Sequence, residues 1–317
     1  MPSVFTDRPA KASSLPIAMI IGLMAACSML PSAASATSIE TQEPSRRSER
    51  GETMGTDKPI VLVVGASGSI GQPAVAESLR KGYQTRALVR DPAQARLFAE
   101  GVEVVVGDLT RAETLDKAVA GVTGVIFTHG ISGNDAKSAE AVNYGAVRNV
   151  LSALKAPARI ALMTSVGVTK PSVGHDWKRR GERLVRASGL PYTIVRPGWF
   201  DYNADNQQQL VMRQGDTHWS GSPADGVVSR QQIAQVLVAS LTSQAATRKT
   251  FELVAERGAA QTDLEPLFSA LPADPPGGHD AIGDRDNLPA TQEPDAVNQA
   301  LEAIKSLYQH QSASAGR

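Results

Sequence analysis

The stretch from residue 60 to residue 71, IVLVVGASGSIG, restricts the fold of this chain more than any other. Five apolar residues, mostly β-branched, lead directly into Gly65, and such a run is typical of a buried parallel strand. A helix is expected from about Ser69 to Gly82. Glycines also make ordinary tight turns. In this setting, however, they let the backbone approach a pyrophosphate, and the helix N-terminus offers free N–H groups. The stretch therefore predicts a dinucleotide-binding turn.

Further apolar runs alternate with segments of helical periodicity. This alternation indicates an α/β fold, a Rossmann-type doubly wound parallel sheet with right-handed crossovers. We assign residues 58–271 to this domain and its small C-terminal substrate-binding portion, with a substrate loop at 198–226. We expect the strand at 102–109 to be buried and the helix at 175–189 to turn its basic residues outward. The expected strands are 60–64, 84–89, 102–109, 124–128, 158–168, 191–200 and 250–254, and the expected helices after the first are 135–155, 175–189, 233–241 and 263–271.

The N-terminal residues 1–57 do not fit this pattern. Basic residues precede an apolar run at 15–30 and the small residues PSAASA at 31–36, which is the layout of a secretory signal, and a polar linker follows. This interpretation predicts export, or membrane anchoring through the N-terminal segment alone. Alternatively, translation starts at Met54, just before the first strand, and the protein is cytoplasmic. Both interpretations stay open.

The C-terminal residues 272–317 also lie outside the expected domain. Up to Pro294 they are rich in proline, aspartate and glycine, and we expect a mobile tail. An amphipathic helix is expected at about 295–308, either packed on the domain or free.

The composition excludes several functional classes. The 317 residues include 32 basic and 32 acidic ones, so no basic excess favours nucleic acid. A single cysteine, Cys27, excludes an intramolecular disulfide or a thiolate cluster. The five histidines lack ligand spacing, so we expect no metal. The expected partner is a small-molecule substrate.

The ends of the later strands suggest which dinucleotide is bound. In NAD-binding proteins an acidic residue after the second strand holds the ribose hydroxyl. Here that position is Arg90, with Arg86 nearby, and a guanidinium pairs with a 2′-phosphate, so NADP is favoured over NAD. A solvated surface arginine is the alternative. Asp108 is a candidate for the adenine and His129 for the neighbouring wall. The alternative for His129 is a hydrogen-bonded loop residue without a role.

Several motifs together resemble the atypical short-chain dehydrogenase/reductases, in the NmrA-like or NAD(P)H-binding group. The resemblance covers roughly residues 58–256 and is specific for the superfamily, but it does not name a substrate. The matching pieces are GASGSIG, VRDP at 89–92, GDL at 107–109, TSVG at 164–167, WKRRGE at 177–182, SGLPYTIVRPG at 188–198 and SRQQIAQVLVASL at 229–241.

The resemblance implies roles for individual residues. Arg90 would take the 2′-phosphate and Asp108 the adenine. Lys178 would stand where the superfamily's active-site lysine binds the nicotinamide ribose, and Thr164 or Ser165 where a serine polarises a substrate carbonyl. The residues implied around the pyrophosphate are Gly65, Ser67, Gly68, Ser69, Ile70 and Gly71.

The chain departs from the superfamily at the acid tyrosine, four residues before the lysine, where it has Gly174. General acid catalysis needs a donor within hydrogen-bond reach. The remaining candidates are His175, Ser165 or a water held by Lys178. Without the resemblance, Lys178 would be an ordinary basic residue on an arginine-rich helix, and His175 a loop histidine near a helix start.

An aromatic group lies beyond the strand at 191–200 and fits an apolar substrate pocket, or equally a core: Trp199, Phe200, Tyr202 and Trp219. The sequence therefore leaves two functions open. The first is an NADPH-dependent reductase of an apolar or aromatic carbonyl, quinone or flavin-like acceptor. The second is a non-catalytic NADP(H)-sensing regulator or assembly factor, which would have a partner protein.

Overall fold

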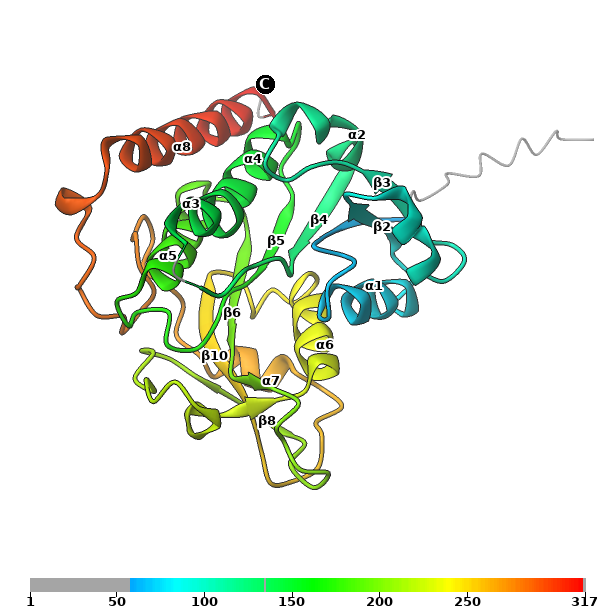
Figure 1. Ribbon diagram of the computed structural model, residues 1–317, viewed down its shortest axis with the longest axis vertical. Coiled ribbons are helices and arrows are strands. Elements are labelled where there is room, and N and C mark those ends of the chain that lie inside the picture. The colour runs from blue at the N-terminus through cyan, green and yellow to red at the C-terminus, as the bar shows by residue number, and fades with distance from the viewer. Residues whose placement is uncertain (1–57, 134, 316–317) are drawn as a thin grey trace, which may run out of the picture. The chain divides into compact units, whose positions relative to one another are not determined.

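The computed structural model describes residues 58–133 and 135–315. Their main sheet has eight strands in the order β3-β2-β1-β4-β5-β6-β10-β8 (Figure 1). All neighbouring strands pair in parallel except β8, which runs antiparallel to β10. From β1 the sheet grows first through β2 to β3 and then, on the other side, through β4 to β10, so the predicted doubly wound sheet is confirmed. The strands are β1 (Ile60–Val64), β2 (Gln84–Val89), β3 (Glu103–Val106), β4 (Val122–Phe127), β5 (Arg159–Met163), β6 (Tyr192–Pro197), β8 (Gln209–Arg213) and β10 (Lys249–Glu256).

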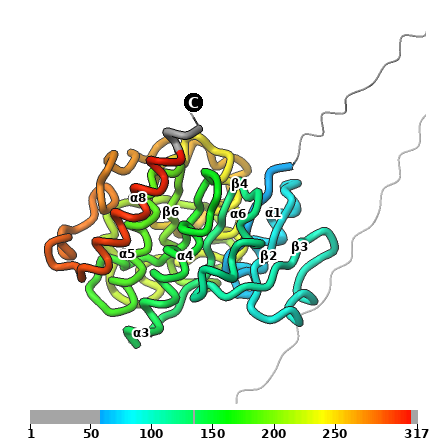
Figure 2. Tube along the Cα trace, turned by 90° about the horizontal axis from the view of Figure 1, so that it is seen from above, coloured from blue at the N-terminus to red at the C-terminus, as the bar shows by residue number. Residues whose placement is uncertain are grey.

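Helices cover both faces of the sheet (Figures 1 and 2). Successive side chains of a strand point to opposite faces, so Val61 and Val63 of β1 enter one core while Leu62 and Val64 enter the other. This explains why the first strand is apolar without interruption. The first core is completed by α1 (Gly71–Arg80), α6 (Arg230–Ser240) and α7 (Glu265–Ser269), and the second by α2 (Asp116–Val119), α4 (Ala146–Ala153), α5 (Val173–Ala187) and α8 (Asp295–Ala315).

Three expectations on the elements need correction. The strand predicted as buried at 102–109 is the short edge strand β3, and Val106 is 49% exposed because only β2 pairs with it. The helix predicted at 135–155 is divided into α3 (Ala136–Ala139), a π-helical segment (Glu140–Gly145) and α4. The predicted substrate loop 198–226 contains β8, together with β7 (Trp199–Phe200), which pairs with β9 (Val227–Val228).

The expectation that α5 turns its basic residues outward is wrong. Arg179 and Arg183, one helical turn apart, are only 2% exposed. Both donate to Asp280, and Arg183 also donates to Glu293. This face is turned toward residues 272–294, which are held against α5 by these ion pairs instead of forming the predicted mobile tail.

The C-terminal helix α8 packs back on the domain and extends to Ala315, beyond the predicted end (Figure 2). Its buried residues Val297, Leu301 and Ile304 join the core of α4 and α5. Among residues 58–133 and 135–315 no helix is both long and apolar enough to cross a membrane. The signal-like segment, the linker and the alternative start at Met54 lie outside the described residues.

Candidate cofactor and active site

The turn between β1 and α1, where the sequence predicted pyrophosphate binding, contains glycines that leave no room for a side chain and ends at an uncapped helix N-terminus. Gly65 has φ +81°, and a β-carbon there would lie 2.7 Å from the backbone nitrogen of His129. A β-carbon on Gly71 would overlap the carbonyl oxygen of Gly65. No side chain caps the N-terminus of α1, and its first turn carries no acidic residue. These features fit a bound phosphate group, because backbone N–H groups and the positive end of the helix dipole are available there.

A cavity of about 810 Å³ runs from this turn along the carboxyl ends of the central strands. Its volume lies within the range of small-molecule sites. In the described part of the chain, no three His, Cys, Asp or Glu side chains are grouped to hold a metal ion. Gly71 and Tyr202 do not line the cavity, but the other predicted site residues do: Gly65, Ser67, Gly68, Ser69, Ile70, Arg90, Asp108, His129, Thr164, Ser165, His175, Lys178, Trp199, Phe200 and Trp219.

At one end of the cavity lie Arg90, after β2, and Asp108, after β3. The Asp108 carboxylate accepts hydrogen bonds from the Thr110 N–H and hydroxyl, at 2.9 and 2.8 Å, which lower its pKa. Arg86, the arginine within β2, is buried and does not line the cavity. It pairs with Glu103 at 2.8 Å and donates to backbone carbonyl groups around α2. Its role is to join β2, β3 and α2.

His129 lines the cavity two residues after the end of β4. Burial lowers its pKa to about 4, so the ring is neutral at pH 7. Its Nδ1 is buried without a hydrogen-bond partner among the described residues, and its ring packs edge-on against Phe127 at 5.6 Å. A buried polar atom without a partner is costly in a folded protein, so its position in the cavity wall suits a ligand contact.

The predicted catalytic residues lie on α5 and directly after β5, where they line the cavity. Lys178 Nζ donates to Ser165 Oγ at 3.2 Å. Burial lowers the pKa of Lys178, while the carboxylate of Glu182, one turn further along α5, opposes this shift. The Thr164 hydroxyl instead donates to Glu182 at 2.7 Å in the interior. Of the two predicted hydroxyl groups, Ser165 is thus the one paired with the lysine.

The position of the superfamily's tyrosine lies close to the backbone of Gly133. A β-carbon on Gly174 would lie 3.2 Å from the carbonyl oxygen of Gly133, and Asn143 Nδ2 donates to the Gly174 carbonyl at 3.4 Å. A side chain at this position would therefore require the Gly133 carbonyl to shift.

His175, one residue further on, lies beside the cavity but has little acid capacity. Its Nδ1 is 3.1 Å from the Lys170 carbonyl oxygen. Because a carbonyl only accepts, Nδ1 carries the proton and Nε2 of the neutral ring does not. Burial also lowers the pKa of His175 below its usual value, so the ring is neutral at neutral pH. Nε2 then has no proton to donate.

The aromatic residues cluster at the opening beyond β6. Trp199, Phe200 and Trp219 line the cavity, whereas Tyr202 is 63% exposed and contacts Trp199 edge-on at 6.1 Å. Trp219 Nε1 is buried without a hydrogen-bond partner among the described residues. Lys170 Nζ donates to the Trp219 carbonyl at 2.8 Å and so joins the two loops of this wall.

Sequence reasoning missed two carboxylates that shape the aromatic loop. Asp225 accepts from the N–H groups of Ser220 and Gly221, both at 2.7 Å, and lines the cavity. Its capping box with Ser222 was visible as a Ser-x-x-Asp pattern. Asp216 accepts from the N–H groups of Gly167 and Thr169, at 2.6 Å each, across 47 residues or more of sequence. No local pattern marks such a long-range contact.

Comparison with solved structures agrees with the observed architecture. A putative NAD-dependent epimerase/dehydratase from Bacillus halodurans superimposes with a TM-score of 0.55 at 23% identity, covering 67% of this chain and all of that protein. An oxidoreductase, ylbE, from Lactococcus lactis gives a TM-score of 0.53 at 16% identity, covering 67% of this chain and 96% of that one. At these identities the likeness establishes the Rossmann-like fold alone.

Sequence relatives extend over the same region. Protein TIC 62 of pea is 27% identical over 262 residues, which is 71% of this chain and 48% of TIC 62. Sanguinarine reductase of Eschscholzia californica is 25% identical over 265 residues, 68% of this chain and 96% of the reductase. The chain spans half or less of the TIC 62 proteins it matches. Residues 65–244, more than half of the chain, match the family model described as NAD(P)H-binding. With its glycine turn, cavity and doubly wound sheet, the chain belongs to the NAD(P)H-binding family.

Proposed function

We propose that this protein is an NADPH-dependent reductase of planar, apolar acceptors, namely aromatic carbonyl, quinone or flavin-like compounds. The observation that carries the proposal is a single cavity. It joins the glycine turn to the Lys178–Ser165 pair and to a wall of Trp199, Phe200 and Trp219. When bound, the nicotinamide supplies the hydride, and the chain supplies orientation and a proton.

The preference for NADP over NAD rests on the end of β2. Arg90 lines the cavity there, and a guanidinium favours a 2′-phosphate. The neighbouring carboxylate, Asp91, does not line the cavity, and its Oδ1 accepts from the Ala93 N–H at 2.9 Å to begin the next 3₁₀ segment. The Asp91 carboxylate is therefore engaged in a local hydrogen bond and poorly placed to accept one from a ribose hydroxyl.

Ser165 donates the proton to the reduced acceptor, and Lys178 then donates a proton to the Ser165 oxygen. The serine hydroxyl lies at the end of β5 with the ammonium group 3.2 Å away, so proton loss from the serine is compensated at once. Glu182 favours the charged form of Lys178 through its nearby carboxylate. The three aromatic side chains exclude water and orient a flat acceptor.

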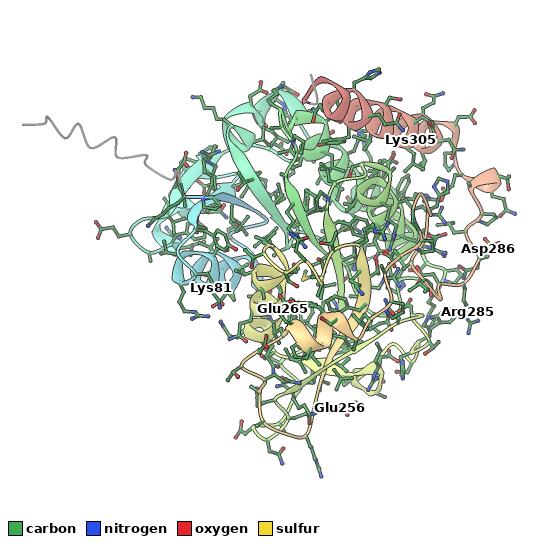
Figure 3. The ribbon with its side chains drawn as sticks, turned by 180° about the vertical axis from the view of Figure 1, so that it is seen from behind. Lys81, Glu256, Glu265, Arg285, Asp286 and Lys305 are labelled. Carbon is green, nitrogen blue, oxygen red and sulfur yellow. The ribbon has the colours of Figure 1, made fainter. Side chains whose placement is uncertain are left out.

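The proposal is tested with purified protein, NADPH and a panel of quinones, flavins and aromatic aldehydes. We expect NADPH consumption with at least one quinone. Lys178→Ala should lower kcat by about 100-fold, the scale of general acid catalysis, with NADPH affinity changed much less. Lys81→Ala, an exposed lysine at the end of α1 (Figure 3), is the matched control and should behave like the wild type. NADPH binding without consumption across the panel would refute the proposal.

A second function is a non-catalytic NADP(H)-sensing regulator or assembly factor. The observation that favours it is Gly174, where the Gly133 carbonyl occupies the approach of a tyrosine. The relatives bear names of both kinds, and one of them is the photosystem II assembly factor Ycf39 of Trieres chinensis, 26% identical over 219 residues. This function predicts different affinities for NADP⁺ and NADPH and a co-purifying partner protein. Equal affinities and an isolated chain would count against it.

A further inference from the structure

The segment of residues 272–294, which we call the strap, crosses α5 on the side opposite its apolar core. It lies outside the residues matched by the family model, which end at residue 244. Its acidic residues pair with arginines of the domain, all buried except the half-buried Arg180: Asp274 with Arg186, Asp280 with Arg179 and Arg183, Asp284 with Arg196, and Glu293 with Arg180 and Arg183. The strap is thus anchored at both ends and in the middle.

Between these anchors the strap contacts the substrate side of the cavity. The guanidinium carbon of Arg285 lies 4.2 Å from the ring centre of Trp219. Asn287 Nδ2 donates to the Thr169 carbonyl at 2.9 Å, while its Oδ1 accepts from Arg179 Nη1 at 2.5 Å. Arg285 does not line the cavity itself, so it supports the indole from outside.

Arg285 contacts the loop that carries Trp219, and Asn287 contacts the loop that carries Thr169. These two loops form the end of the cavity that contains the aromatic residues. Trp219 lines the cavity with an indole N–H that has no partner among the described residues. Thr169 belongs to the loop that begins at Ser165 and continues to Lys170, whose ammonium group donates to the Trp219 carbonyl. The backbone carbonyl of Arg285 also accepts from Arg179 at 2.6 Å, which fixes the strap at this point.

We propose that Arg285 and Asn287 are positioning residues through which the strap sets the orientation of Trp219 and of loop 165–170, and thereby the affinity for the planar acceptor. The inference rests on the proposed reductase function for the identity of the ligand. It adds a specificity element that lies outside the family's matched residues. In the described part of the chain, the hydrogen bonds and the ring contact of these two side chains go to Thr169, Arg179 and Trp219 and not to the glycine turn or Arg90. We therefore expect cofactor affinity not to depend on them.

The test measures binding of 1,4-naphthoquinone by calorimetry in the presence of NADP⁺, which cannot reduce it. The free energy of an exposed cation–π contact corresponds to about a fivefold change in a dissociation constant. Arg285→Ala, which removes the contact that orients Trp219, should therefore weaken quinone binding by about fivefold. Arg285→Lys keeps a cation over the indole and should retain most of the affinity. Asp286→Ala removes the neighbouring exposed side chain on the same loop (Figure 3) and should leave it unchanged. NADP⁺ affinity should be equal in all variants, and under turnover Arg285→Ala should raise the KM for quinone without changing the KM for NADPH.

Two results would overturn the inference. One is unchanged quinone binding in both Arg285→Ala and Asn287→Ala. The other is an equal loss of quinone and NADP⁺ affinity in these variants that Arg285→Lys does not rescue, which would indicate a general loss of structure. If the wild type itself binds no quinone, the proposed function fails, and the strap is then judged by near-ultraviolet circular dichroism. The Trp219 signal, defined by the difference from Trp219→Phe, should be lost in Arg285→Ala, and its persistence would overturn the inference.

Discussion

Arg196 and Glu182 form a two-pronged ion pair in the protein interior, with Nε–Oε1 at 3.0 Å and Nη2–Oε2 at 2.7 Å, and both side chains are fully buried. Glu182 also accepts from Thr164 and pairs with Arg186. It thus links α5 to β6 and to Thr164, the residue after β5 and before Ser165. Burial acts to raise the pKa of Glu182, but Arg196 and Arg186 outweigh this effect and hold the pKa at about 2.

Glu182→Gln should therefore be strongly destabilising. It removes a buried charge and leaves two guanidinium groups short of a partner, a change that costs about 3–5 kcal/mol in buried pairs. The measurement is the free energy of unfolding from urea denaturation. Glu302→Gln, in an exposed pair with Lys305 on α8, is the control and should change the stability little. A loss for Glu182→Gln no larger than for Glu302→Gln would contradict this account of the network.

Glu252 of β10 should make the protein less stable as the pH rises. Burial, opposed by Arg196 and reinforced by Asp216 and Asp284, raises its pKa from 4.5 to about 8. Its Oε1 has no hydrogen-bond partner among the described residues. Between these pH values the folded state keeps a proton that the unfolded chain has lost. The contribution to stability is therefore fully present below pH 4.5 and is lost as the pH approaches 8, at a rate of up to about 1.4 kcal/mol per pH unit.

Glu252→Gln stays neutral at every pH, so this part of the pH dependence should disappear and the variant should be the more stable one at pH 8. Urea denaturation at several pH values measures it. Glu256→Gln, at the exposed end of the same strand (Figure 3), should keep the slope of the wild type. An unchanged slope in Glu252→Gln would show that another group is responsible.

Arg90→Asp should shift the cofactor preference from NADP toward NAD. The variant removes a guanidinium from the cavity and places a carboxylate where it repels a 2′-phosphate and accepts from a ribose hydroxyl. A charge-assisted contact of this kind corresponds to roughly a tenfold or larger change in the ratio of the two dissociation constants. Arg96→Asp, on an exposed part of the following 3₁₀ segment, is the control. An unchanged ratio in Arg90→Asp would exclude Arg90 from phosphate recognition.

Features defined by neighbouring residues could be predicted from the sequence, whereas those that depend on contacts between distant residues could not. The glycine turn and the strand ends at Arg90 and Ser165 could be located because each is defined by neighbouring residues in an apolar run. The burial of Arg179 and Arg183 could not, because their partner Asp280 is about 100 residues away and helical spacing alone does not distinguish a solvated charge from a paired one. The strap was misjudged for the same reason, since its proline- and aspartate-rich composition resembles that of a disordered segment.

Gly174→Tyr should not restore the activity typical of the superfamily. The β-carbon alone would lie 3.2 Å from the Gly133 carbonyl oxygen, so the loop must move before a ring can enter the site. We expect Gly174→Ala to change the stability little, because the gain in helix propensity on α5 opposes the close contact with Gly133. Gly174→Tyr should be destabilising, since overpacking costs about 1–3 kcal/mol. Gly174→Tyr should lower kcat for the accepted quinone, because the loop shift displaces the Asn143 amide that bonds to the Gly174 carbonyl and to Ile131. The measurements are thermal unfolding and steady-state kinetics. A rise in kcat for Gly174→Tyr without loss of stability would mean that the Lys178–Ser165 pair lacks only a tyrosine, and that it is not the proton source in this chain.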